Sequence, residues 1–276
     1  MKRSSYAAPY GIWMVMFTIV PLLFVVYFAF TSKTGAFTFD NFEKFMKPMY
    51  LEALFLSLKL AFFCTVICFL IGYPAAKFLA SKDFSKNKSF VILILIPMWM
   101  NFLLRTYAWV GILEDTGIVN TVLEFMGLPR IQMIGTEGAV LLGMVYNFLP
   151  FMILPIYTVL KKMDTRVIEA AEDLGANPIR VFWRVTLPLS MPGVVSGITM
   201  VFMPAATTFA ISRLLGNGMF WLMGDLIDYQ FREISMSSGQ NFGSAMSLIM
   251  MVLIIVSVGF LRRFEDKGQK KEGTKW

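Results

Sequence analysis

Six long apolar runs constrain the fold of this chain more than any other feature of its sequence. A helix of about 20 apolar residues crosses the roughly 30 Å hydrocarbon core of a bilayer. The composition agrees, since 57% of the residues are hydrophobic and the mean hydropathy is +0.66. The sequence therefore predicts an all-α, polytopic membrane protein with six transmembrane helices. The predicted spans cover residues 10–30, 53–79, 90–113, 139–160, 192–211 and 242–261.

No repeat, low-complexity tract or Pro/Gly/Ser-rich linker divides the chain, so residues 1–276 are predicted to form a single domain. The first apolar run follows Lys2 and Arg3, as a secretory signal would, but it is too long for one and no cleavage site follows it. We interpret it as a retained span. Cys64 and Cys68 lie one helical turn apart in the second predicted span, and we expect buried free thiols there.

The distribution of basic residues predicts the orientation of the chain in the membrane. Of the 25 Lys and Arg residues, 17 lie in the N-terminal segment, the connections after the second and fourth predicted spans, and the C-terminal tail. Because basic connections are usually cytoplasmic, both termini are predicted to face the cytoplasm. This topology accounts for the net charge of +7, so we expect no nucleic acid partner.

Residues for enzymatic chemistry are scarce in the sequence. The chain has no histidine, which excludes histidine-based acid–base catalysis and histidine-ligated metals. It also lacks the G-x-x-x-x-G-K-[ST] pattern that holds nucleotide phosphates. We therefore expect a non-catalytic chain with no metal and no cofactor of its own, driven by energy that a partner supplies.

Residues 161–189 form an unusually long polar connection between the fourth and fifth predicted spans. Asp164 or Thr165 is placed to cap a first short helix. Gly175 supplies the backbone freedom that ends this helix and turns the chain. The pattern predicts a helix followed by a glycine bend.

A second short helix is predicted after the bend. Asn177 is a favourable N-cap, and Pro178 is favourable at the first helical position. Leu187 and Pro188 are expected to close this helix before the fifth span. From the residues alone, two alternatives stay open: the pair of helices presents a surface to a partner protein, or it packs only on its own bundle.

The segment EAAEDLGANPIRVFWRVTLP, residues 169–188, resembles the E-A-A-x3-G-x9-I-x-L-P loop of binding-protein-dependent ABC importer permeases. Only Val185 departs from that pattern, in the place of isoleucine. The resemblance implies an ABC importer type I permease fold, in which residues 161–189 form a cytoplasmic coupling loop docked on an ATPase that binds ATP and Mg. The implied ATPase-contacting residues are Glu169, Ala170, Ala171, Gly175 and Phe182.

Other stretches resemble one branch of this family, the B-type permeases of spermidine/putrescine importers. They include IPMWMNFLLRTYAW, NFLPFMILPIY, GDLIDYQF and NFGSAMS. The resemblance implies a bacterial cytoplasmic (inner) membrane protein whose partners are a second homologous permease, two ATPase subunits and an extracytoplasmic polyamine-binding protein. An importer for another small solute, an anion or an amino acid, remains an alternative, and a free-standing channel is a more distant one.

The route for a polyamine should offer carboxylates for its ammonium groups and aromatic faces for its methylenes and charges. Residues of both kinds lie in or near the outward half of the predicted spans. Aromatic side chains also gather at membrane interfaces without any ligand, so that alternative stays open. The substrate-pathway candidates are Trp99, Tyr107, Trp109, Tyr146, Asp225 and Asp228.

Arg105 lies within the third predicted span, where a charge facing lipid costs about 2.5–3.5 kcal/mol. Glu114 or Asp115 could pair with it, in an ion pair that either gates the pathway or is purely structural. If the substrate were an anion, Arg105 would be the first residue to suspect of binding it.

A short amphipathic segment is predicted near the outer surface, after the fifth span. Phe220, Met223, Ile227 and Phe231 recur at helical spacing. The pattern predicts a helix lying at the membrane surface, and an ordinary packed loop helix without a binding role stays open as the alternative.

Overall fold

The computed structural model describes residues 8–81, 88–232 and 236–270. Its regular structure there is helical, apart from an isolated bridge between Thr31 and Phe37. Five helical segments in this part of the chain are long and apolar enough to cross a membrane, which confirms the all-α membrane fold but not the count of six. These segments are Pro9–Ala29, Pro48–Ala80, Glu137–Lys162, Pro178–Ala206 and Gly239–Leu261. Six basic residues counted for the predicted orientation lie outside the described residues: Lys2, Arg3, Lys82, Lys86, Lys271 and Lys275.

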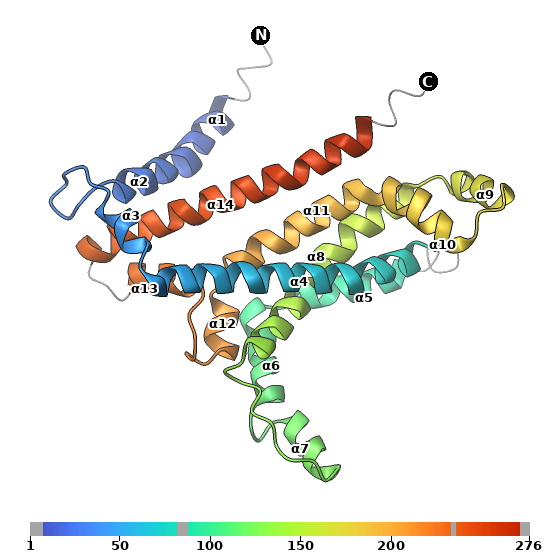
Figure 1. The fold of residues 1–276 in the computed structure, drawn as a ribbon, viewed down its shortest axis with the longest axis horizontal. Helices are drawn as coiled ribbons and strands as arrows, with labels where there is room; N and C mark the ends of the chain where they lie inside the picture. Colours follow the sequence, from blue (N-terminus) through green and yellow to red (C-terminus); the bar gives the residue numbers. More distant parts are fainter. Residues whose placement is uncertain (1–7, 82–87, 233–235, 271–276) are drawn as a thin grey trace.

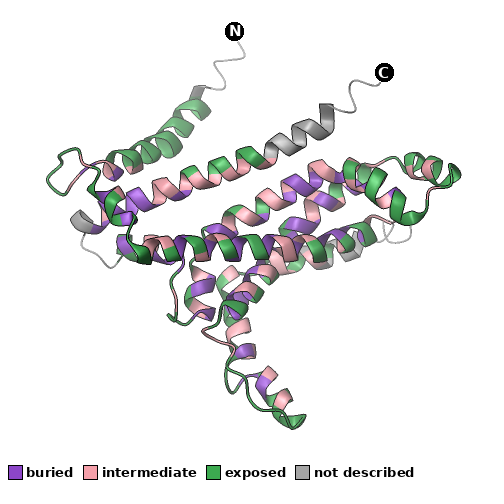
Figure 2. Cartoon of the chain, viewed as in Figure 1, coloured by how far each residue is buried: buried purple, intermediate pink, exposed green. Residues whose placement is uncertain are grey.

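Three long helices form the core of the molecule. They are α4 (Pro48–Ala80), α8 (Glu137–Lys162) and α11 (Leu187–Ala206), which pack side by side (Figure 1). In a bilayer a helix bonds its backbone groups within itself, which is why apolar sequence of this length becomes helical. The strip where the three helices meet is buried, while their outer faces are exposed (Figure 2).

Small side chains allow these helices to pack closely. A Cβ atom added at Gly193 of α11 would lie only 2.9 Å from the carbonyl oxygen of Pro155 in α8. Such contacts between small residues and a neighbouring backbone stabilise helix pairs in membranes through van der Waals packing. Cys64 and Cys68 are free and fully buried in the same core, which confirms that prediction.

The first and last spans pack against each other at one side of the core. The first is a continuous helical segment made of α1 (Ala8–Met14), the π-helical turn η2 (Val15–Ile19) and α2 (Val20–Ala29). Its partner is α14 (Met236–Lys270), which also contacts α11. Most side chains of the first span are exposed (Figure 2), so lipid or another protein must cover its apolar surface.

The third predicted span is broken into two helices, α5 (Lys88–Trp99) and α6 (Phe102–Leu113). Between them the side chain of Asn101 accepts hydrogen bonds from the backbone amides of Leu103 at 2.8 Å and Leu104 at 3.4 Å. Asn101 therefore caps a new helix, which leaves the direction of α5 (Figure 1). The prediction of one continuous helix over residues 90–113 is wrong.

The fifth predicted span starts earlier and ends earlier than expected. α10 (Pro178–Val181) continues through the π-helical turn η3 (Phe182–Thr186) into α11 without interruption. Leu187 and Pro188 thus begin α11 and do not close the preceding helix, because the amide of Leu187 donates to the carbonyl of Phe182 and so continues the helix as a π turn, and Pro188 follows in the first turn of α11.

The opposite boundary of the fifth span differs as well. α11 ends at Ala206, and Ile211, predicted to end this span, belongs to the separate short helix α12 (Ala210–Leu215). The helix predicted within residues 220–231 exists as α13 (Met223–Arg232), and it packs against α14 with Met223 fully buried. α13 and α3 (Asp40–Phe45) lie at one end of the bundle, while α9 (Thr165–Asp173) and α10 lie at the other (Figure 1).

Candidate functional site

The hairpin of residues 164–186 joins α8 to α11 and contains α9, a bend, α10 and η3. Asp164 caps α9, because its carboxylate accepts a hydrogen bond from the backbone amide of Arg166 at 3.0 Å. Asn177 caps α10 by accepting a bond from the amide of Arg180 at 2.8 Å, with Pro178 at the first helical position. Both predicted helix starts are confirmed.

The bend of the hairpin is closed by backbone hydrogen bonds around Gly175. Its φ of +81° lies in the left-handed region, which glycine adopts without strain. The amide of Gly175 donates to the carbonyl of Glu172 at 2.8 Å, and that of Ala176 donates to Ala171 at 3.1 Å. This pair of bonds is a Schellman motif, so the bend predicted from the glycine is confirmed and has a defined shape.

The tip of the hairpin exposes apolar side chains. Leu174 is 89% exposed beside the bend, and Ile179 and Trp183 on the following helix are also largely exposed. The sequence pattern places Leu174 and Ile179 on the apolar faces of the two short helices, and the structure shows that both are exposed. The tip therefore carries a surface that another protein could cover.

The predicted coupling residues divide between the surface and the interior of the hairpin. Glu169 and Ala170 on α9 are exposed, as is Gly175 at the bend, while Ala171 is partly buried. Glu169 also borders a cavity of about 320 Å³ between the hairpin and the adjoining ends of α4 and α8, which Lys77 lines as well.

Phe182 packs against this chain's own bundle. Its ring lies edge-to-face on Tyr73 of α4, with 5.5 Å between the ring centroids. The ammonium group of Lys77 lies 5.1 Å from the same ring, within the range of a cation–π contact. Phe182 thus anchors the hairpin to α4, and its predicted contact with an ATPase stays a prediction.

The aromatic pathway candidates lie on the broken third span and on α8. Trp99, at the end of α5, is 82% exposed, and Tyr107 on α6 is also exposed. Trp109 and Tyr146 form an edge-to-face pair with 5.4 Å between their centroids. The structure therefore brings two of the four aromatics together and leaves the other two on the surface of this subunit.

Asp228, one of the two acidic candidates, is already neutralised within the chain. Its carboxylate oxygens pair with Arg213 at 2.7 Å and with Arg232 at 2.8 Å. It also borders a cavity of about 590 Å³ lined mainly by apolar residues of α11, α13 and α14. A cationic substrate would have to compete with two guanidinium groups for this carboxylate.

Asp225, the other acidic candidate, is buried on α13, outside the five spans. One carboxylate oxygen accepts a hydrogen bond from the amide of Leu222 at 3.0 Å, and the other has no partner among the described residues. Burial raises the pKa of the Asp225 carboxyl to about 6, because removal from water disfavours its charged form. Its position makes it a buried structural group of α13.

Arg105 on α6 is only 8% exposed and does not form the predicted ion pair with Glu114 or Asp115. Both acids are exposed and follow the end of α6 at Leu113, which carries them two turns away from the guanidinium group. Within the described part of the chain, Arg105 Nε has no hydrogen-bond partner.

Comparisons with known proteins place the chain in a family. The family described as "Binding-protein-dependent transport system inner membrane component" matches residues 9–270. The spermidine/putrescine transport system permease protein PotB of Haemophilus influenzae is 38% identical over 255 residues, which cover 89% of this chain and 88% of that protein. PotB of Escherichia coli is 34% identical over 250 residues, which cover 88% and 90%.

Solved structures show the same fold at low sequence identity. A chain of the crystal structure of a bacterial ABC transporter that imports alginate superposes with a TM-score of 0.81 and 17% identity, over 96% of this chain and 94% of that chain. A chain of the inward-facing MetNI methionine ABC transporter gives a TM-score of 0.52 and 19% identity, over 79% and 94%. Since the family match extends over nearly the whole sequence and the relatives are more than 30% identical, this chain belongs to the inner membrane components of binding-protein-dependent transport systems.

Proposed function

We propose that this chain is a permease subunit of an ATP-driven importer of polyamines such as spermidine or putrescine. The observation that carries this proposal is the hairpin of residues 164–186, whose helices are capped, whose bend is closed, and whose tip exposes Leu174. Such a surface suits docking into a groove of another protein. The PotB relatives support polyamines as the substrate.

The orientation and the partners follow from this function. The hairpin and both termini face the cytoplasm of a bacterial cell, and the chain crosses its inner membrane several times. Two ATPase subunits bind ATP and Mg, so this chain holds no cofactor and catalyses no reaction itself. A second, homologous permease completes the membrane part, and an extracytoplasmic polyamine-binding protein delivers the substrate.

Coupling runs through the continuous helix from Pro178 to Ala206. Closure of the ATPase dimer displaces the docked hairpin, and because α10, η3 and α11 are continuous, the displacement reaches the core of the bundle. The bundle then changes between outward-open and inward-open states.

Aromatic faces are the substrate contacts that the structure supports best. Trp99 and Tyr107 are exposed, and the Trp109–Tyr146 pair is nearby on α6 and α8. Each aromatic face contributes about 0.5–2 kcal/mol to a cation–π contact with an ammonium group. Asp225 and Asp228 contribute less directly to substrate binding. Asp225 is buried and bonded to the amide of Leu222, and Asp228 is paired with two arginines.

The decisive experiment disturbs the bend and the carboxylate of the hairpin. Gly175→Pro cannot keep a φ of +81°, and Glu169→Gln removes the charge predicted to meet the ATPase. In the reconstituted complex, both variants should lose most of the ATP hydrolysis that the loaded binding protein stimulates. Copurification of the ATPase distinguishes lost docking from lost coupling. Normal transport by both variants would refute the proposed role of the hairpin.

Gly35 offers a matched control for Gly175. It has a φ of +80°, its amide donates to the carbonyl three residues earlier at 3.0 Å, and a Cβ added there would meet nothing within 4 Å. Gly35→Pro therefore imposes the same backbone conflict at the other end of the bundle. It should leave the stimulated ATP hydrolysis largely intact.

Import of an anion is the second candidate function, and Arg105 favours it. A buried guanidinium group with no carboxylate partner among the described side chains suits a negatively charged substrate better than a cation. Measuring which ligands of the binding protein stimulate ATP hydrolysis separates the two candidates: stimulation by spermidine or putrescine supports the polyamine importer, and stimulation only by anions supports the alternative.

A further inference from the structure

An arm made of α6, α7 (Ile118–Phe125) and the return segment 126–136 leaves the bundle sideways. Figure 1 shows it directed away from the axes along which α4, α8 and α11 run. The return segment is tied to α12, because the amide of Gly135 donates to the carbonyl of Leu215 at 2.8 Å. The arm is thus a fixed projection from the subunit.

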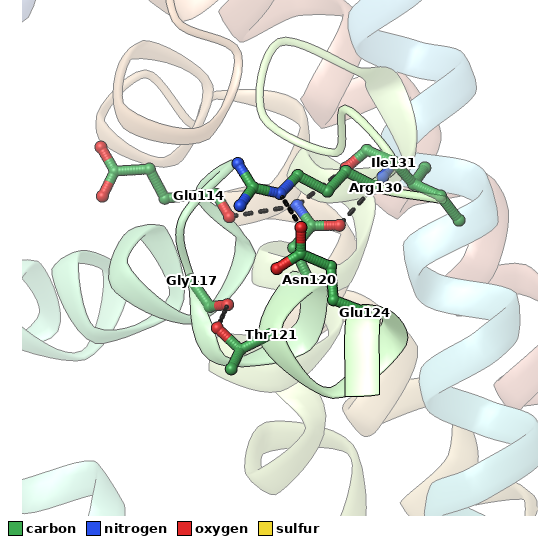
Figure 3. Close-up of polar contacts among 7 residues, drawn as sticks. All are labelled: Glu114, Gly117, Asn120, Thr121, Glu124, Arg130 and Ile131. Atoms are coloured by element: carbon green, nitrogen blue, oxygen red, sulfur yellow. Dashed lines mark hydrogen bonds and ion pairs between the residues drawn. The ribbon is translucent and has the colours of Figure 1, made fainter. Parts of the chain in front are cut away.

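The interior of the arm is polar (Figure 3). The amide nitrogen of Asn120, which is 1% exposed, donates to the carbonyls of Glu114 at 3.3 Å and Ile131 at 3.1 Å. Its oxygen accepts from the amide of Ile131 at 2.9 Å. The guanidinium of Arg130 lies 2.6 Å from the carboxylate of Glu124 and lowers the pKa of that group. These contacts join α7 to the return segment, beside Val119, Met133 and Ile134, which pack partly buried against the core.

The outside of the arm is apolar. Ile118, Val122 and Phe125 follow one another at intervals of four and three residues, so they share one face of α7. All three are exposed, and Phe125 reaches 93%. The inner side of α7 carries Asn120 with the partly buried Val119 and Leu123, and its outer side still exposes three large apolar side chains.

Neither lipid nor water suits this face. The return segment has non-helical backbone, which hydrocarbon does not tolerate unless protein or water surrounds it. A helix lying on lipid usually carries Lys and Arg on its polar face, whereas the arm has Glu114, Asp115 and Glu124 against Arg130. If only water surrounded the arm, the three large apolar side chains of this face would stay exposed, which is unfavourable. We therefore expect the surface of another protein to cover this face.

We propose that α7 clasps the second permease subunit, seating Ile118, Val122 and Phe125 in an apolar socket with a basic rim. The arm leaves the bundle sideways (Figure 1), which is the direction in which a neighbouring membrane subunit lies, whereas a water-soluble binding protein approaches the ends of the spans. The acidic residues of the arm, Glu114, Asp115 and Glu124, are the reason why we expect that rim to be basic. This inference rests on the proposed function, which supplies the second permease.

Photocrosslinking identifies the occupant directly. A benzoyl-phenylalanine at position 125 should form an adduct with the second permease in the whole complex in lipid nanodiscs. The same probe at Phe37, an exposed residue at the end of the bundle remote from the hairpin, is the control and should give no such adduct. Adducts of position 125 only with the binding protein or only with lipid, or equal permease adducts at both positions, would overturn the inference.

A charge at the same position tests the energetic contribution. Because Phe125 makes almost no contact within the chain, Phe125→Asp leaves the folding of this subunit unchanged. The loss of one buried phenylalanine should reduce retention of the second permease in detergent by about tenfold. Phe37→Asp should not reduce it. Unchanged retention in Phe125→Asp contradicts the clasp, while ATPase binding at the hairpin reports independently on the proposed function.

Discussion

Replacing Asp225 with asparagine should stabilise this protein at neutral pH. The folded state raises the pKa of this carboxyl from 3.8 to about 6, so the folded protein binds the proton more tightly than the unfolded chain. The contribution of this carboxyl to stability is therefore greatest below about pH 4, falls as the pH rises to about 6, and is lost above it. A difference of about 2 pKa units corresponds to about 3 kcal/mol of unfolding free energy at pH 7.

Asparagine removes this dependence and keeps the structural contact. Its side-chain oxygen can still accept the hydrogen bond from Leu222, and it carries no charge to bury. A gain of about 3 kcal/mol raises the unfolding midpoint by about 6–12 °C. Heating the complex at pH 5 and pH 7.5, followed by size-exclusion chromatography that detects a fluorescent fusion of this chain, measures the midpoint of wild type and variant.

Asp228→Asn is the matched control, because this carboxylate is paired with two arginines. It should lower the midpoint at both pH values, the opposite sign from Asp225→Asn. Burial of Asp225 is not destabilising if Asp225→Asn is less stable than wild type at pH 7.5, or if the gain in midpoint over wild type is no larger at pH 7.5 than at pH 5.

Three further substitutions test the packing and polar contacts of the spans by the same heating assay. Gly193→Ala forces a methyl group against α8 and should lower the free energy of unfolding by about 1–3 kcal/mol. An unchanged unfolding midpoint would show that the two helices can separate freely. Tyr73→Phe removes the 2.8 Å contact with the hydroxyl of Ser190 and should lower the free energy of unfolding by about 1 kcal/mol. The check is that Tyr73→Phe causes no further loss in a protein that already carries Ser190→Ala. Lys59→Ala breaks a half-exposed ion pair with Glu137 at 2.6 Å and should lower the free energy of unfolding by less than about 1 kcal/mol. A larger loss would indicate that this pair is shielded from water in the complex.

Local signals in the sequence predicted the hairpin well. A cap such as Asp164 or Asn177 acts on amides two or three residues away, and Gly175 acts on the chain at its own position, so short stretches of sequence contain the whole interaction. The coupling roles of Glu169 and its neighbours stay predictions, because they depend on a protein outside this chain.

Boundaries between spans were predicted less well, for a physical reason. Hydropathy reports how apolar a segment is and not whether its axis is straight, so the capped break at Asn101 was missed. Pro188 is unfavourable inside a helix, but the π turn before it removes the conflict and lets the helix continue. Both outcomes depend on backbone geometry that composition does not encode.

Partners of charged side chains were the least predictable feature. Arg105 was matched with acids close in sequence, although a helix end separates them. Asp228 pairs with Arg213, which is 15 residues away on another helix. Such pairs depend on how helices are placed in space, which the order of residues along the chain does not reveal.

The packing of the first span against the last has a consequence for biogenesis. Of the five spans, residues 9–29 are made before the others, yet their main neighbour among the described helices, α14, is made after the other four. The side-chain amide of Asn241 donates to the carbonyl of Thr31, a contact that closes a loop of more than 200 residues. During translation the helix of residues 9–29 therefore lacks its main partner and is accessible to chaperones or to another subunit. Residues 48–206 can already associate with one another at that stage.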